Sequence, residues 1–171
     1  MTLPTDMVHQ EICGERLKIP LTRQPAMNDL QTEEYVLDLI QKRVEEAEGN
    51  MVILVDACVI RFGVQEEVKT FLERTGFPVY STPMGKTAVD ESYSRYGGVS
   101  ISIPPLDRLY TDVGFQIYIG TITHPLVKER VESTKLVMSI GSLQSDFNTG
   151  NFSYNIPTGR HIEVSPEYLG I

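Results

Sequence analysis

The stretch Met51–Val55, which reads MVILV, decides the fold. A continuous run of apolar, largely β-branched residues is typical of a strand that is covered on both faces in a parallel sheet. After it, apolar residues recur at helical spacing from Val64 to Leu72 and Gly76 ends the pattern, which predicts an amphipathic helix. Phe77–Ser81 (FPVYS) predicts a short strand. Strand, helix and strand in this order predict a βαβ unit with a right-handed crossover.

The same alternation extends on both sides of this unit. Upstream, a single apolar stripe predicts a helix over Glu33–Glu48. Downstream, the predicted elements are a strand at Ile117–Ile122, a helix that begins near Pro125, and strands at Lys135–Ile140 and His161–Val164. Alternating strands and helices predict an α/β fold with a three-layer, doubly wound, mostly parallel, Rossmann-like sheet.

Residues 1–31 show no sustained hydrophobic period and contain Pro4, Pro20 and Pro25. We interpret them as an extended segment that leads into the domain or an interdomain linker. The domain itself is then expected to cover residues 32–171.

Length, charge and cysteine content bound the class of protein. The chain has 171 residues, a single-domain length, and a net charge of −8. Nucleic-acid binding draws on clustered Lys and Arg, so this charge argues against such a partner. No apolar run is long enough to cross a membrane or to form the core of a signal peptide. Cys13 and Cys58 have neither metal-type spacing nor a disulfide framework, which favours a reduced, cytoplasmic setting.

The loops after the strands hold no standard cofactor motif. Neither G-x-G-x-x-G nor a Walker A sequence occurs in them. Gly141-Ser142 follows a strand and either approaches a phosphate or simply makes a tight turn, and the turn is favoured. His9, His124 and His161 lack the spacing of metal ligands. We therefore assign no catalytic, cofactor-binding or metal-binding residue.

Cys58 and Arg61 form the one candidate binding site in the chain. They follow the strand at Met51–Val55, at the edge where open α/β sheets bind ligands. A helix start and an arginine both favour a thiolate, and arginine can grip a carboxylate through two hydrogen bonds. The pair is therefore a candidate receptor for a 2-oxo acid. The alternative is a buried structural cysteine beside a surface arginine.

Three segments carry a family resemblance: VDAC at residues 55–58, PMGK at 83–86 and SDFNTG at 145–150. Together they resemble the middle domain of pyruvate decarboxylase, a thiamine-diphosphate enzyme. The resemblance implies a parallel sheet of about six strands, and non-oxidative decarboxylation of pyruvate to acetaldehyde and CO₂ in an intact enzyme. It also implies a homo-oligomer, dimer or tetramer, and PMGK as an interdomain packing signature.

Thiamine diphosphate and Mg²⁺ are held in this family between the first and third domains. A glutamate of the first domain and a Gly-Asp-Gly motif of the third supply the key groups, and this sequence contains no Gly-Asp-Gly. We therefore expect this chain, by itself, to bind neither cofactor and to act as an inactive scaffolding or regulatory fragment. Its expected partners are the flanking N- and C-terminal domains.

The resemblance also bears on Cys58 and Arg61, which match the substrate-activation site of fungal pyruvate decarboxylases. Pyruvate is thus a candidate effector. Two positions depart from the fungal pattern, which often has a second cysteine where Val59 stands and a histidine where Phe62 stands.

One segment, Val99–Gln116, interrupts the family pattern. Removing these 18 residues restores RYGG-IYIG, close to the uninterrupted sequence of relatives. Val99-Ser100 can be encoded as an intron donor and Phe115-Gln116 as an acceptor. We interpret the segment as a retained in-frame intron, with a genuine surface loop as the alternative, and expect an excursion that leaves the sheet intact.

Two other readings of the whole chain stay open. One is a free-standing α/β module that binds a small anion or nucleotide without catalysis. The other is a nonfunctional product of a misread gene.

Overall fold

The computed structural model describes residues 6, 9–11, 13–20, 28–97, 117–165 and 169–170. The chain divides into two units, Met1–Glu34 and Tyr35–Ile171. The first contains a 3₁₀ helix at Gly14–Lys18. The second contains the sheet and the helices that pack against it. The predicted insertion at Val99–Gln116 lies outside the described residues.

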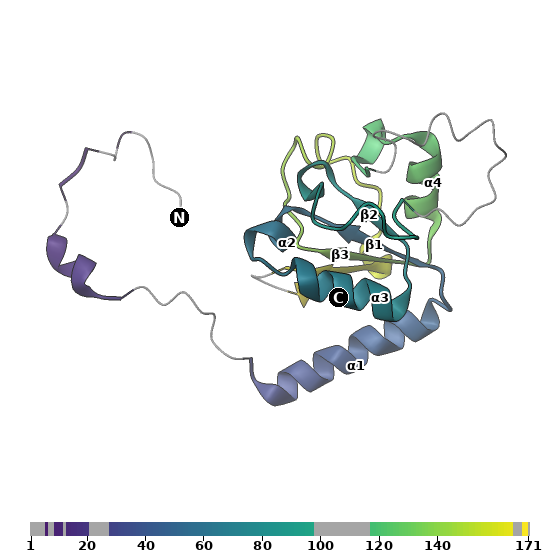
Figure 1. Cartoon of the computed structure of the whole chain (residues 1–171), viewed down its shortest axis with the longest axis horizontal. Coiled ribbons are helices and arrows are strands. Elements are labelled where there is room, and N and C mark those ends of the chain that lie inside the picture. The colour runs from purple at the N-terminus through teal and green to yellow at the C-terminus, as the bar shows by residue number, and fades with distance from the viewer. Residues whose placement is uncertain are drawn as a thin grey trace. The chain divides into compact units, whose positions relative to one another are not determined.

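The sheet confirms the predicted α/β class (Figure 1). Its order is β2-β1-β3-β4-β5, in which the first four strands are parallel and β5 runs antiparallel to β4. The strands are β1 Met51–Val55, β2 Val79–Ser81, β3 Leu136–Ile140, β4 His161–Val164 and β5 Leu169–Gly170. Every residue of β1 is buried, as the unbroken apolar run predicted.

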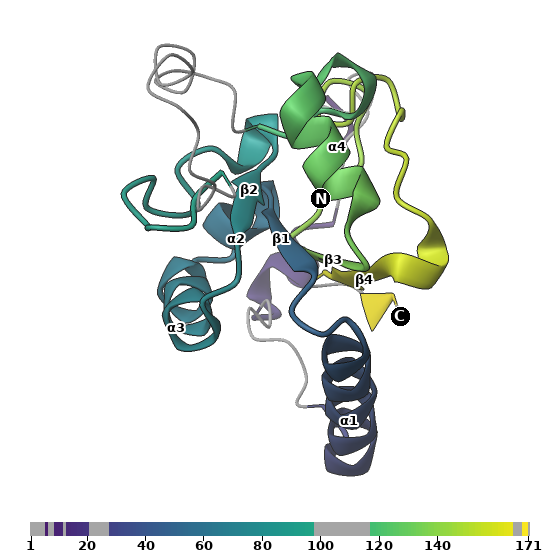
Figure 2. The same cartoon turned by 90° about the vertical axis from the view of Figure 1, so that its right-hand side faces the viewer.

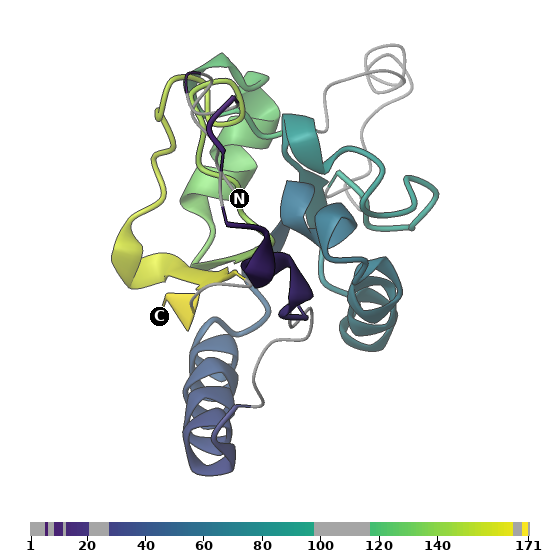
Figure 3. The ribbon, with the colours of Figure 1, turned by 90° about the vertical axis from the view of Figure 1, so that its left-hand side faces the viewer.

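Helices cover both faces of this sheet, which makes three layers. The helices are α1 Leu30–Glu46, α2 Ala57–Arg61, α3 Gln65–Thr75 and α4 Pro125–Ser133. Ile53 and Val55 of β1 share one core with residues of α2 and α3 and with the last part of α1. Val52 and Leu54, which point the other way, share a second core with α4. Figure 2 and Figure 3 show α3 and α4 on opposite sides of the strands.

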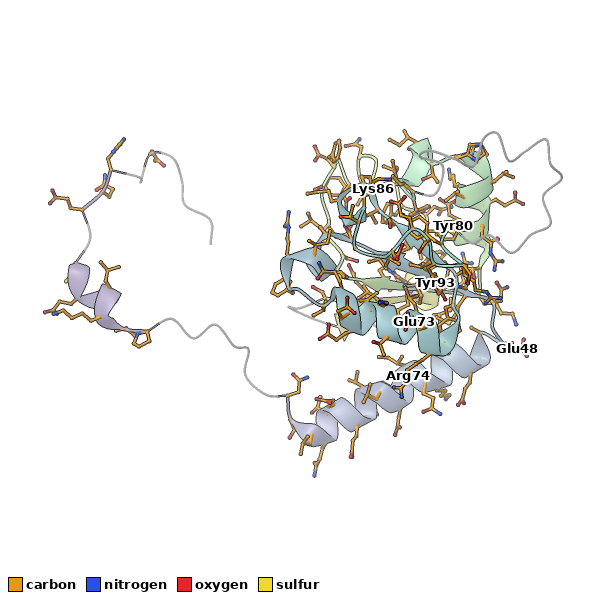
Figure 4. All side chains as sticks on the ribbon, viewed as in Figure 1. Glu48, Glu73, Arg74, Tyr80, Lys86 and Tyr93 are labelled. Carbon is orange, nitrogen blue, oxygen red and sulfur yellow. The ribbon has the colours of Figure 1, made fainter. Side chains whose placement is uncertain are left out.

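The helix ends follow local chemistry that the sequence predicted. Gly76 closes α3 with a left-handed φ of 66° and donates its N–H to the Leu72 carbonyl at 2.8 Å. Tyr93 holds the same end from outside (Figure 4), because its hydroxyl donates to the carbonyls of Leu72 and Phe77 at 3.0 and 3.1 Å. Pro125 occupies the first turn of α4, where no N–H is needed.

The predicted strand at Ile117–Ile122 is wrong. Ile117 makes only an isolated bridge to Ser81, and Gly120–Ile122 is a 3₁₀ helix. Gly120 has a left-handed φ of 64°, and a Cβ there would collide with Ser153 and Thr149. The described residues therefore form five strands, of which four are parallel, instead of about six.

Thr87 is strained and generates a prediction. It is an exposed β-branched residue with φ of 74°, a left-handed conformation that glycine adopts without penalty. We expect Thr87→Gly to stabilise the domain by about 1 kcal/mol, because the released strain exceeds the added freedom of the unfolded chain. Urea unfolding at constant m-value measures the change.

A matched control separates strain from the general effect of glycine. Thr70 is an exposed threonine inside α3, with ordinary helical geometry. Thr70→Gly should destabilise by about 0.4 kcal/mol, which is the difference between the helix propensities of threonine and glycine. A loss of stability in both variants would contradict the strain at Thr87.

Candidate functional site

The centre of the carboxyl edge of the sheet is Asp56, which directly follows β1. Its side chain is buried, at 4% exposure, and caps α2 by accepting the Ala57 N–H at 2.6 Å. Its backbone N–H donates to the Ile140 carbonyl of β3 at 3.0 Å. Asp56 therefore fixes where β1 ends and α2 begins.

The same carboxylate gathers the loops that follow the neighbouring strands. Thr82, after β2, donates its hydroxyl to Oδ1 at 2.6 Å. Leu143, after β3, donates its N–H to Oδ2 at 2.8 Å. Asn148 donates Nδ2 to both oxygens, at 2.9 and 2.7 Å. These donors are all neutral, so hydrogen bonds rather than an ion pair compensate the buried charge.

Asn148 extends this network to a second loop. Its side chain is fully buried, and its Oδ1 accepts the Met84 N–H at 3.0 Å. Nδ2 also donates to the Leu143 carbonyl at 2.9 Å. Tyr154 lies beside it and donates its hydroxyl to the Asn148 carbonyl at 3.2 Å. Burial, with the nearby Asp56 charge, raises the pKa of Tyr154 and keeps that hydroxyl protonated.

The network closes the place where open α/β sheets usually hold a ligand. That place lies between β1 and β3, because the chain leaves β1 over one face and reaches β3 over the other. Here the Cys58 N–H donates to the Gly141 carbonyl at 3.0 Å. A Cβ on Gly141 would lie 2.6 Å from the Val59 nitrogen, so this loop sits directly against α2. Gly141 therefore makes a close turn, and Asp56 puts a negative charge where a phosphate would bind.

Cys58 and Arg61 lie one turn apart on α2, at the predicted edge. Cys58 is half-buried, and its sulfur donates to the Ser142 carbonyl at 3.8 Å. Arg61 is exposed in the last turn. The Asp56 carboxylate at the N-cap offsets the positive potential that the sequence assigned to the helix start. Of the two candidate residues, Arg61 therefore supplies the positive charge.

The PMGK segment forms a 3₁₀ helix at Pro83–Gly85, capped by Thr82. Gly85 is required by space, since a Cβ would collide with the Val55 carbonyl oxygen. Lys86 pairs with Glu91 at 3.1 Å, so its charge is directed to the surface loop (Figure 4).

The remaining candidates do not gather into a site. His161 shares a hydrogen bond with Ser139 at 2.7 Å, and burial lowers its pKa. No group of three or more His, Cys, Asp or Glu in the described ranges is placed to hold a metal ion. A surface hollow of about 500 Å³ lies between α3 and residues 87–91, and three acidic side chains among its lining residues oppose an anion: Glu66, Asp90 and Glu91.

Comparison with known proteins now places the chain. The family described as "Thiamine pyrophosphate enzyme, central domain" matches residues 37–104. The pyruvate decarboxylases of Aspergillus terreus and Candida albicans are 41% and 42% identical, over 99% of this chain and 26% of each relative. Pyruvate decarboxylase isozyme 1 of Saccharomyces cerevisiae is 38% identical over 99% of this chain and 27% of its own length.

The chain thus matches, through residues 37–104, the central domain of the thiamine pyrophosphate enzymes. Within that class it is a relative of the fungal pyruvate decarboxylases and spans about a quarter of their length. In the parts of the chain that the structure describes, no helix has the length and apolar character that a membrane crossing requires.

Sequence reasoning missed the pairing of Asp56 with Asn148. VDAC, which contains Asp56, and SDFNTG, which contains Asn148, entered the family resemblance as separate segments, and the two were not joined. One signal was available, because a carboxylate directly after a fully buried strand needs a partner. The partner lies 92 residues away, and no local pattern identifies it.

Asp56→Asn tests how far the fold depends on this carboxylate. The new amide group would face the donors of Asn148 and Leu143, so hydrogen-bond donors would meet. We expect a loss of about 3 kcal/mol in the free energy of unfolding, measured by urea denaturation.

Asp146→Asn is the matched control, because Asp146 is exposed and also accepts the N–H of the next residue, at 2.7 Å. It should change stability no more than ordinary surface substitutions do. An equal loss of unfolding free energy in the two variants would show that the buried network contributes no more to stability than a surface hydrogen bond does.

Proposed function

We propose that this chain acts as the central domain of a pyruvate decarboxylase, in an enzyme that converts pyruvate to acetaldehyde and CO₂. The observation that carries the proposal is the 38–42% identity to fungal pyruvate decarboxylases over 99% of the chain. The proposal includes a cytoplasmic location, which the cysteine content favours, and assembly as a homo-oligomer, dimer or tetramer, which the family resemblance implies.

Thiamine diphosphate and Mg²⁺ do not fit the described residues of this chain. Magnesium prefers carboxylate and other oxygen ligands. Asp56 is the buried carboxylate at the sheet edge, and hydrogen bonds from the chain's own donors already engage both of its oxygens. In this proposal the cofactor is held by other parts of the enzyme, and the central domain supplies support.

The support surface is the carboxyl edge of the sheet. Phe62, Met84 and Phe147 are large apolar side chains there, with exposures of 59%, 36% and 72%. Asn148 ties the loops of Met84 and Phe147 together. Exposed apolar groups gathered on rigid loops are typical of a docking surface. We assign this surface to a flanking domain of the same enzyme.

The geometry favours this role over a free-standing nucleotide-binding module. Such a module needs backbone N–H groups that are open to phosphate. Here the N–H groups of Ala57, Cys58 and Leu143 bond to the chain's own oxygens.

Cys58 and Arg61 are proposed to bind pyruvate as an effector. Arg61 would hold the carboxylate, and the sulfur of Cys58 would face the carbonyl. Asp56 positions both residues, because it caps the short helix that carries them. Phe62 stands where the fungal pattern has histidine, so the site relies on Arg61 for polar contact.

Sequencing the full-length transcript tests the enzyme assignment. We expect the reading frame to continue into regions that match the rest of the fungal relatives, and to lack the codons for Val99–Gln116. A mature transcript that encodes only residues 1–171, insert included, would overturn the assignment and the retained-intron interpretation together.

The effector site is tested by alkylation of Cys58 in a Cys13→Ser background, where Cys58 is the remaining thiol. Pyruvate should slow the reaction with iodoacetamide. Arg61→Ala should raise the pyruvate concentration that gives half of the full protection by about tenfold or more. Arg74→Ala, on α3, is the control and should leave protection unchanged. Alkylation at one rate with and without pyruvate would rule out the effector role while leaving the enzyme assignment intact.

A further inference from the structure

The outer edge of β2 is paired at two points. Val79 donates its N–H to the Arg95 carbonyl at 3.1 Å and accepts the Gly97 N–H at 2.7 Å, which pairs it in parallel with Tyr96. Further along, Ser81 pairs in parallel with Ile117 and accepts the N–H of Tyr118 at 2.9 Å.

Both pairs lie on the same edge. The backbone groups of Pro78 and Thr82 bond to β1, so even-numbered positions of β2 face β1. Val79 and Ser81 alternate with them and face outward. The residues around Tyr96 and those around Ile117 therefore occupy successive positions of one line alongside β2.

We propose that these two segments are halves of a single sixth strand, and that Val99–Gln116 is an insertion that the sheet does not need. The missing sixth strand and the misplaced strand prediction at Ile117–Ile122 then have one cause. Ile117, the first residue of the predicted strand, is in register with Ser81, whereas Gly120–Ile122 is a 3₁₀ helix. This inference does not require the enzyme assignment, because the two bridges on β2 carry it and the family pattern supplies only the bounds Val99–Gln116.

The register of the two pairs also determines how many residues must join the two halves. From Val79 to Ser81 the β2 register advances two residues. From Tyr96 to Ile117, once Val99–Gln116 is removed, the chain advances three. The joined strand must therefore hold one extra residue, which is a β-bulge. Gly97 already has the left-handed φ of 72° that one common type of bulge uses.

The two tyrosines confirm this count independently. Tyr96 is 4% exposed and lies in the core shared with α3, whereas Tyr118 is fully buried in the core shared with α4. In the joined chain they are four residues apart, which would put them on the same face of a regular strand. One bulged residue moves them to opposite faces, as observed.

Deletion variants test the proposal. Deleting Val99–Gln116 should raise Tm by about 5 °C, because closure of a long connection no longer opposes folding. Hydrogen exchange at the Gly97 and Tyr118 amides should slow. Deleting 98–116 should also fold, since it joins the halves without a bulge and keeps both tyrosines on their faces.

The matched control is a deletion that removes one more residue than the deletion of 98–116. Deleting 97–116 leaves the strand one residue short, so Tyr96 and Tyr118 cannot both reach their cores, and Tm should fall below that of the parent chain. Replacing 99–116 with an equally long Gly-Ser segment should leave Tm within about 2 °C.

Two results would overturn the proposal. One is a lower Tm or lost Tyr118 protection in both the deletion of 99–116 and the Gly-Ser replacement. The other is equal stability of the deletions of 97–116 and 99–116, which would show that strand register plays no part.

Discussion

A buried carboxylate with only neutral donors around it constrains the rest of this domain. Asp56 must keep all of its hydrogen bonds, because an unpaired charge in the interior is far more costly than the bonds are individually worth. Its partners come from the loops that follow β2 and β3 and from the start of α2. The loops at this edge are consequently set in one arrangement, and the fold is specified by a polar contact as much as by its two apolar cores.

Local patterns predicted the elements that depend on local causes. The MVILV run needs only its own side chains to form a buried strand, and Gly76 needs only its backbone freedom to end a helix. The sequence could not show that Asn148 lies against Asp56, since that contact joins residues 92 positions apart. Thr87 also escaped prediction, because threonine rarely adopts a left-handed backbone and the surrounding loop imposes it.

The same contrast separates the parts of the candidate site. The position of Cys58 and Arg61 followed from the rule that ligands approach the carboxyl ends of parallel strands. The electrostatics around them did not, because the capping carboxylate was not recognised as a charge beside the helix start. A fold shared with nucleotide-binding proteins thus carries a crevice filled by its own loop, and the proposed function uses the exposed Phe62, Met84 and Phe147 as a docking surface instead.

The two bridges on β2 have a consequence for behaviour outside the native state. A parallel sheet that ends in an uncovered strand offers its backbone to any other extended chain. Tyr96 and Ile117 occupy that edge while holding it through only a few hydrogen bonds. Loosening of this short cover would expose β2, whose three residues are buried and largely apolar. Self-association during folding or mild heating is therefore expected to begin at this edge, well before the central strands separate.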